Sequence, residues 1–297
     1  MFKTEKEKKD FCKKYNISED RFRESLVSWD GLSLIAEDYN SKRNEHMDTV
    51  RKYADNIQRC QYVHSLSYRV KDVEHLIEKI IRKNPKFLEK GDSISLSNYE
   101  KIITDMMGIR VLILFKEDWR YVHDFIMKEY GNSLLENPFV HVRKGDDCSL
   151  YEGVINIIDD KPYRSAHYVI KSENGLGVEI QVRTLYEEAW SEIDHKIRYP
   201  YNISDEVITR YIDIMNRITG VGDEMGSFIN DYWKTFQSRM TNGIIDDNEV
   251  YDFILSEIDK IEEENIKNSI RDKIMQAENY QERRKLSDLA EIIISDL

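Results

Sequence analysis

Cysteine and proline are scarce in this chain. Its 297 residues include only three cysteines, Cys12, Cys60 and Cys148, and four prolines. Three well-separated cysteines form neither a disulfide framework nor a spaced metal motif, so the composition predicts a reducing, cytoplasmic setting. The longest apolar run, 111–115, is far too short to span a bilayer. The N-terminus lacks the apolar stretch of a secretory signal, and none is expected.

Positive charge is also in deficit. The formal net charge is −12 and the pI is near 5.2, which disfavours indiscriminate binding to nucleic acid or to an acidic membrane. Most of the acidic excess lies in residues 246–297, so the rest of the chain is closer to neutral. An apolar content of 40% is enough to build a substantial core.

Three segments differ in their hydrophobic periodicity. Residues 1–60 and 201–297 have helical patterns, with an interruption near 241–243, whereas 61–200 mixes helical and strand patterns. The chain is therefore predicted to be α+β, a mixed sheet flanked by helices, with helical N- and C-terminal extensions.

Capping and turn residues locate the expected elements. Ser18 and Ser41 are expected to begin helices, the second running to about residue 61, and Asp72 a further helix that ends before Pro85. Strands are expected at 107–115, 137–143 and 151–158. A hairpin should pair 165–172 with 176–184 through Asn174-Gly175, and a helix should follow at 185–198.

The last hairpin strand carries the most informative pattern. Glu179, Gln181 and Arg183 alternate with Val178, Ile180 and Val182, so the three polar side chains share one face. Three polar residues on one strand face are not typical of a core. They predict the floor of a charged site.

A second acidic residue, Asp105, stands just before the apolar strand at 107–115, which also contains Arg110. Carboxylates from two strands of one sheet can share a divalent cation, and Mg²⁺ takes one or two protein carboxylates together with phosphate oxygens and water. A single carboxylate near a strand end is more often a solvated charge. Asp105 and Glu179, taken with the nearby basic residues, are predicted to form a Mg²⁺ site.

Basic and aromatic residues accompany these acids. Arg69 and Lys71 share a face of an extended segment, and Lys79 lies on the next helix, a trio suited to a triphosphate although such residues are often merely solvated. A second group precedes and enters the hairpin and comprises Lys161, Tyr163, Arg164 and His167. An exposed tyrosine can stack on a base, whereas a lone strand histidine is more often structural.

The helix at 185–198 is expected to close one wall of the site. Most of its charged residues fit a salt-bridged surface helix, with Trp190 in the core. Glu192 and His195 are the exceptions that we expect to face the site.

The order and spacing of these motifs resemble the synthetase domain of the RelA/SpoT family, over about residues 60–200. The matching segments are Arg69-x-Lys71, Asp105-x-x-Gly108-Ile109-Arg110, Tyr163-Arg164-Ser165-x-His167 and Glu179-x-Gln181-x-Arg183, followed by Glu192-x-x-His195. The resemblance implies a nucleotidyltransferase-like fold. It also implies transfer of the β,γ-diphosphate of ATP to the 3′-hydroxyl of GTP or GDP, with Mg²⁺ as cofactor.

The resemblance also implies roles for individual residues. Asp105 and Glu179 match the catalytic, metal-binding acids, and Glu179 can activate the acceptor hydroxyl. Tyr163 matches the residue that stacks on guanine. Two further groups follow from the same resemblance: ATP contacts at Arg69, Lys71, Lys79 and Arg110, and acceptor contacts at Lys161, Arg164, His167, Gln181, Arg183, Glu192 and His195.

The sequence departs from the family pattern in two places. Pro162 directly precedes Tyr163, where the family usually has a glycine, so the loop is shorter. The His-Asp hydrolase domain of the long members has no counterpart before the synthetase motifs. The chain therefore resembles a small stand-alone synthetase, predicted to be cytoplasmic and to form homo-oligomers through its helical extensions.

Two other functions fit the same sequence. Toxin-like members of the family pyrophosphorylate the 3′-CCA end of tRNA, although residues 1–24 form no strong basic arm for tRNA. A catalytically inactive nucleotide-binding or oligomerisation module is the other alternative, and the presence of both Asp105 and Glu179 argues against it.

Overall fold

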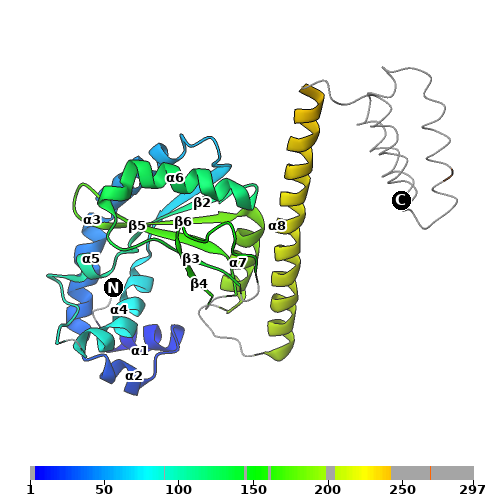
Figure 1. The fold of residues 1–297 in the computed structure, drawn as a ribbon. Helices are drawn as coiled ribbons and strands as arrows, with labels where there is room; N and C mark the ends of the chain where they lie inside the picture. The colour runs from blue at the N-terminus through cyan, green and yellow to red at the C-terminus, as the bar shows by residue number, and fades with distance from the viewer. Residues whose placement is uncertain are drawn as a thin grey trace. The chain divides into compact units, whose positions relative to one another are not determined.

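The computed structural model contains a mixed six-stranded sheet (Figure 1), in the order β1-β2-β6-β5-β3-β4. β2 and β6 are parallel, as are β3 and β4, whereas β1/β2, β5/β6 and β3/β5 are antiparallel. This arrangement confirms the predicted α+β class. The strands are β1 Ser65–Val70, β2 Met107–Ile113, β3 Phe139–His141, β4 Asn156–Ile158, β5 Ser165–Lys171 and β6 Gly177–Thr184.

Helices precede, separate and follow the strands. They are α1 Glu5–Lys14, α2 Glu19–Glu24, α3 Trp29–Ile57, α4 Val73–Leu88, α5 Tyr99–Ile102, α6 Trp119–Tyr130, α7 Leu185–Arg198 and α8 Glu206–Thr241, with short 3₁₀ turns at Lys116–Asp118 and Gly131–Ser133. The structure describes residues 4–89, 91–143, 146–159, 162–198, 205–241 and 268. The chain forms two compact units, Met1–Phe228 and Ile229–Leu297.

The two faces of the sheet differ in chemistry. Tyr168 on β5 is fully buried on the apolar face, where its hydroxyl accepts a hydrogen bond from Trp119 Nε1 of α6 at 3.1 Å. α6 therefore covers this face, and Ile109, Val111 and Ile180 extend the same buried layer. α7 lies over the other, polar face (Figure 1).

Two helix starts occur where they were predicted. Ser18 caps α2 through a hydrogen bond from the Arg21 N–H, and Asp72 caps α4 by accepting from Glu74 N–H. The predicted start at Ser41 is wrong. α3 begins after its cap Ser28, and Ser41 lies inside the helix, where its hydroxyl bonds the Asp38 carbonyl at 2.7 Å. Buried residues on both sides of the expected break, from Trp29 to Tyr39 and from His46 to Ile57, keep the helix in one piece.

The predicted end of α4 before Pro85 is also wrong, because the helix continues to Leu88. Buried Asn84 holds this region in place. Its amide donates to the Ser25 carbonyl at 2.7 Å and its carbonyl accepts from Ile94 N–H at 2.7 Å. These tertiary bonds offset the cost of an internal proline.

The hairpin prediction is confirmed. β5 and β6 pair across the turn, and Gly175 takes a φ of +82°, which favours glycine. The strands expected at 137–143 and 151–158 reduce to three residues each. The second is shortened because residues 150–154 form turns. Within the described residues, no helix combines the length and the apolar character needed to cross a membrane.

Candidate active site

Four neighbouring strands present side chains on the polar face of the sheet. The register places Arg69 of β1 beside Gly108 of β2, and Gly108 beside Glu179 of β6. Gln181 of β6 pairs with His167 of β5. Because directly paired residues in a sheet point to the same side, these side chains share one face.

The predicted row on β6 is confirmed by direct contacts. The Gln181 amide donates to Glu179 Oε2 at 3.0 Å, and Arg183 Nη2 donates to Gln181 Oε1 at 2.8 Å. Arg183 Nε also donates to the hydroxyl of Ser165 on β5 at 3.0 Å. The row is a connected polar network that fixes the direction of each side chain.

Asp105 joins two of the predicted phosphate-binding lysines. Its Oδ2 atom lies 3.1 Å from Lys71 Nζ and forms a short hydrogen bond with Lys79 Nζ. Burial raises the pKa of the Asp105 carboxyl, but the charges and hydrogen bonds of Lys71 and Lys79 outweigh it and leave that pKa below its usual value. Asp105 is therefore held as a carboxylate.

Glu179 is also kept ionised. Burial raises its pKa, but the hydrogen bond and charge of His167, whose Nδ1 lies 3.3 Å from Glu179 Oε1, bring the net pKa below its usual range. Asp105 raises and Lys79 lowers the pKa of Glu179 as well, so these charges act on one another. The two predicted acids belong to one electrostatic cluster.

The donor set around Asp105 suits a magnesium ion that also binds phosphate. Asp105 Oδ1 is buried and has no hydrogen-bond partner, whereas Oδ2 holds the lysines. Within the described residues no group of three or more His, Cys, Asp or Glu side chains is arranged to hold a metal ion. Mg²⁺ needs fewer protein ligands than that, because it commonly takes one or two carboxylates and completes its shell with phosphate and water.

Gly177, which no sequence motif marks, determines how closely the backbone before Asp105 approaches β6. A Cβ atom on Gly177, at the start of β6, would lie 2.6 Å from the Thr104 carbonyl oxygen. Only glycine lets the backbone before Asp105 approach β6 so closely. Its signal in the sequence is weak, because a glycine at a strand start also fits an ordinary turn.

α7 forms one wall of the site, as predicted. Glu188 contributes to this wall in addition to the predicted Glu192. Glu188 lies 2.8 Å from Arg110 Nη1 and 3.2 Å from Arg183 Nη1, so one carboxylate bridges arginines of β2 and β6. Glu192 also pairs with Arg110. Glu188 was assigned to a surface salt bridge, yet its position four residues before Glu192 placed both on one helix face.

Arg69 and His195 lie at the same wall. The charge of Arg69 interacts with those of Arg110, Glu179 and Glu192. Burial lowers the pKa of His195, Glu192 opposes this, and the positive charges of Arg69 and Arg110 lower it further. The wall therefore combines several positive groups with acidic partners.

Aromatic side chains line the far end of the polar face. The Arg183 guanidinium lies 5.4 Å from the Tyr163 ring centroid, and the His141 ring is 5.6 Å from Tyr163. The rings of Phe139 and His167 stack with centroids 5.0 Å apart. Phe139 and His141 were missed, although their spacing of two on β3 places them on one side.

One predicted acceptor residue, Arg164, is not part of this cluster. Arg164 is 4% exposed and faces Asp146 at 3.0 Å and Asp223 at 3.7 Å, away from the β6 row. The structure does not bring it to the site, because the partly buried Asp146 and the buried Asp223 compensate its charge. Lys161 lies outside the described residues.

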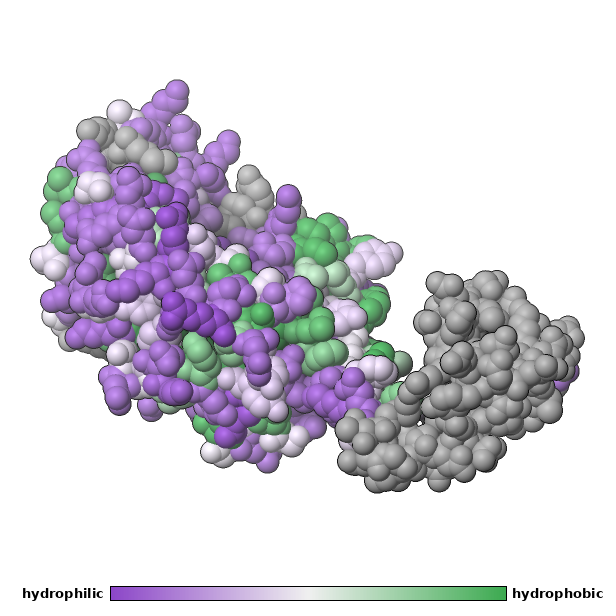
Figure 2. All heavy atoms as spheres, turned by 90° about the horizontal axis from the view of Figure 1, so that it is seen from above, coloured by the Kyte–Doolittle hydropathy of each residue, from purple (hydrophilic) through white to green (hydrophobic). Residues whose placement is uncertain are grey.

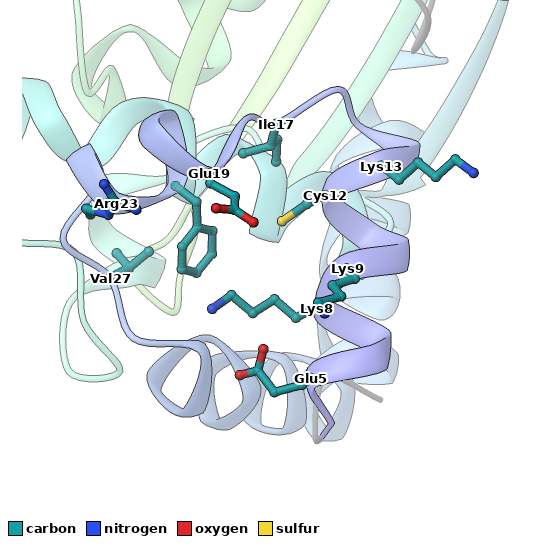
Figure 3. Close-up of a pocket in the computed structure, with 10 residues that line it drawn as sticks. Glu5, Lys8, Lys9, Cys12, Lys13, Ile17, Glu19, Arg23 and Val27 are labelled. Atoms are coloured by element: carbon teal, nitrogen blue, oxygen red, sulfur yellow. The ribbon is translucent and has the colours of Figure 1, made fainter.

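A separate hollow lies between α1 and α2 (Figure 3). Figure 3 shows Lys8 and Lys9 from α1 on one side and Arg23 on the other. Lys8 Nζ lies 4.6 Å from the Phe22 ring centroid. None of the predicted site residues lines this hollow, so the polar sheet face is the candidate active site.

Comparison with known proteins finds relatives over the part of the chain that contains this site. Residues 68–204 match the family model described as the region found in RelA / SpoT proteins. The chain is 26% identical over 186 residues to GTP pyrophosphokinase YjbM of Bacillus subtilis, covering 60% of this chain and 75% of that protein. It is 26% identical over 177 residues to GTP pyrophosphokinase YwaC of the same organism, covering 53% and 72%.

Among solved structures, the small alarmone synthetase 1 from Bacillus subtilis gives a TM-score of 0.49 at 21% identity, over 67% of this chain and 99% of that one. The family match spans all the predicted site residues, from Arg69 to His195. Residues 68–204 of this chain are therefore similar to the region found in RelA / SpoT proteins.

Proposed function

We propose that this chain transfers the β,γ-diphosphate of ATP to the 3′-hydroxyl of GTP or GDP, producing guanosine penta- or tetraphosphate. The curated relatives, whose names describe GTP pyrophosphokinases, support this activity. The observation that carries it is the pairing of Asp105 with Lys71 and Lys79 on the sheet face that holds Glu179.

The reaction joins the acceptor oxygen O3′ to the β-phosphorus of ATP. The bond between that phosphorus and the α–β bridging oxygen breaks, AMP leaves, and the proton of the 3′-hydroxyl is released. Such a transfer depends on in-line positioning and charge neutralisation rather than on a covalent enzyme intermediate. The polar face offers both, because it holds fixed carboxylates among several cations.

Each group has a proposed task. Lys71, Lys79 and Arg69 bind the phosphates of ATP, with Arg110 held beside them by Glu188. Glu179, kept ionised by His167, accepts the hydrogen bond of the acceptor hydroxyl.

Asp105 Oδ1 and Glu179 are the atoms that would hold Mg²⁺. The ion would supply positive charge to the polyphosphate. The unpaired state of Asp105 Oδ1 supports this assignment.

The acceptor is assigned to the end of the face that carries aromatic rings. Tyr163 supplies a ring for stacking on guanine, and its packing against Arg183 and His141 holds it in place. His167, Gln181 and Arg183 line the same end, with Glu192 and His195 on the α7 wall.

The decisive experiment is incubation of the full chain with γ-labelled ATP, Mg²⁺ and GDP, GTP or bulk tRNA. Label should appear in a guanosine nucleotide carrying a 3′-diphosphate, with release of AMP. Label in tRNA instead would assign the toxin-like reaction, and no transfer to any acceptor would contradict the proposed enzyme.

A paired variant shows whether the transfer belongs to this site. Asp105→Asn should abolish the label in guanosine nucleotides, whereas Asp124→Asn, a change to an exposed carboxylate on α6, should leave it intact.

A further inference from the structure

Both peptide bonds that flank Tyr163 are held by buried side chains. The carbonyl of Pro162 accepts a short hydrogen bond from Nδ2 of Asn216 on α8, and the N–H of Arg164 donates to Oε2 of Glu187 on α7 at 3.2 Å. Asn216 is 7% exposed and Glu187 is 1% exposed. Because a peptide bond is planar, two fixed peptide bonds determine the backbone angles of the residue between them. The direction in which the Tyr163 side chain leaves the backbone is therefore set from α7 and α8.

Arg143, which follows β3, joins these two anchoring side chains. Its Nε donates to Asn216 Oδ1 at 2.6 Å, and its Nη2 forms a short ion pair with Glu187 Oε1. The first bond orients the Asn216 amide, because with the oxygen facing Arg143 the NH₂ group faces the loop. A Cβ atom on Gly220, one turn further along α8, would lie 3.3 Å from Arg143 Nη1, so the guanidinium packs closely against the helix. We call Arg143, Glu187 and Asn216 the Tyr163 clamp.

α8 turns polar residues inward to make such contacts. Asn216, Thr219 and Asp223 are buried, whereas Ile218 and Val221 are 65% and 67% exposed. Figure 2 shows hydrophobic residues gathered where Figure 1 places α8. A surface helix normally buries its apolar side. The buried polar side of α8 therefore indicates specific hydrogen bonds rather than general hydrophobic packing.

The clamp holds the Tyr163 ring at the aromatic end of the polar sheet face. The ring centroid lies 5.6 Å from that of His141 and 6.3 Å from that of Trp190, and the Arg183 guanidinium lies 5.4 Å away. A tyrosine on an unanchored loop would lose conformational freedom when it stacks on a base, and this cost would weaken binding. A loop that is anchored before the base arrives avoids most of that cost.

We propose that the Tyr163 clamp positions this ring for the guanine base of the acceptor, with Asn216 as the positioning residue that α8 contributes. The proposal rests on the function proposed above, because it assigns a task at the acceptor end of the same site. The three clamp side chains act through the backbone of the loop. Asn216 lies beyond residues 68–204, so the family match does not include it.

Calorimetric titration of the full chain with GDP tests the clamp without requiring transfer. Asn216→Ala should raise the Kd for GDP about five- to tenfold, the effect of roughly one lost hydrogen bond, and leave the Kd of a non-hydrolysable ATP analogue unchanged. Asn216→Asp removes the donor to Pro162 with little change of shape and should weaken GDP binding at least as much. The matched control is Thr219→Ala, a buried polar residue on the same side of α8, which should leave both constants unchanged. Wild-type GDP affinity in both Asn216 variants would overturn the proposal.

A double-mutant cycle shows whether Asn216 acts through the ring. In a Tyr163→Ala background, Asn216→Ala should have no further effect on GDP affinity, because the ring that it positions is absent. An effect as large as that seen beside the intact tyrosine would assign Asn216 to general packing and overturn the proposal.

Hydrogen exchange provides a readout that needs no nucleotide. The Arg164 amide, which donates to Glu187, should exchange faster in Asn216→Ala than in the wild type, but not in Thr219→Ala. Unchanged exchange in Asn216→Ala would overturn the clamp. A wild type that binds GDP but transfers no diphosphate would contradict the proposed reaction alone, whereas a wild type that binds no GDP would overturn both proposals.

Discussion

The hydroxyl of Thr184 donates a hydrogen bond of 3.0 Å to the carboxylate of Asp223, joining the last residue of β6 to the middle of α8. Asp223 also lies 3.7 Å from Arg164 Nη1, and both side chains are almost fully buried. The strand that carries Glu179 and Arg183 is thereby fastened to α8.

Replacing Asp223 by alanine should lower the free energy of unfolding by about 3 kcal/mol, because it leaves the buried Arg164 undercompensated. Urea denaturation provides the measurement. Asp213→Ala on the exposed side of the same helix is the control and should change stability little. Equal losses of unfolding free energy in the two variants would contradict a larger contribution from the buried Asp223.

Glu179→Gln should reduce kcat by about 10²- to 10⁴-fold, because the amide cannot take a proton from the acceptor hydroxyl. The thermal midpoint should remain close to that of the wild type, since the amide has nearly the same shape. Glu173→Gln, in the exposed turn of the same hairpin, is the matched control and should retain full activity. Unchanged turnover in Glu179→Gln would remove this residue from the chemistry.

Gly177→Ala should lower kcat/KM by up to about 10²-fold, because the added methyl group forces the Thr104 backbone away and displaces Asp105. A crystal structure of the variant should show the shifted loop. Gly131→Ala adds a methyl group in ordinary contact, 3.7 Å from Met127, and should leave activity unchanged. An active Gly177→Ala enzyme would mean that the position of Asp105 tolerates such a shift.

Tyr163→Ala should raise the KM for the guanine nucleotide about tenfold or more while the KM for ATP stays the same, because base stacking contributes about 1–3 kcal/mol. Tyr163→Phe keeps the ring and should retain acceptor affinity. Steady-state kinetics with each nucleotide varied in turn separates the two constants. Equal rises in both would indicate general damage to the packing against Arg183.

The free energy of unfolding should decrease as the pH is lowered, partly because of Asp105. Its pKa in the folded protein is depressed below the unfolded value, so its contribution is complete above the unfolded pKa of about 4 and is lost as pH falls through the folded pKa. In Asp105→Asn, unfolding free energies measured between pH 5 and pH 3 should show a shallower dependence on pH. Parallel curves for the two proteins would contradict this linkage.

Local patterns were sufficient for much of the fold. The alternation of Glu179, Gln181 and Arg183 predicted their shared face, and Asn174-Gly175 predicted the hairpin, because strand geometry and turn conformation depend on neighbouring residues. The helix start predicted at Ser41 and the helix end predicted before Pro85 were wrong for the opposite reason. Distant contacts, such as that of Asn84 with Ser25, outweighed the local preference.

In the candidate site, too, some features follow from local sequence and others depend on distant contacts. The sequence alone determined which residues carry charge, their alternation along β6, and the family to which residues 68–204 are similar. Only the tertiary structure decided that Glu188 bridges Arg110 and Arg183, that Arg164 faces Asp223, and that Gly177 admits the backbone of Thr104. These relationships join positions far apart in the chain, and the packing that brings them together leaves no periodic pattern in the sequence.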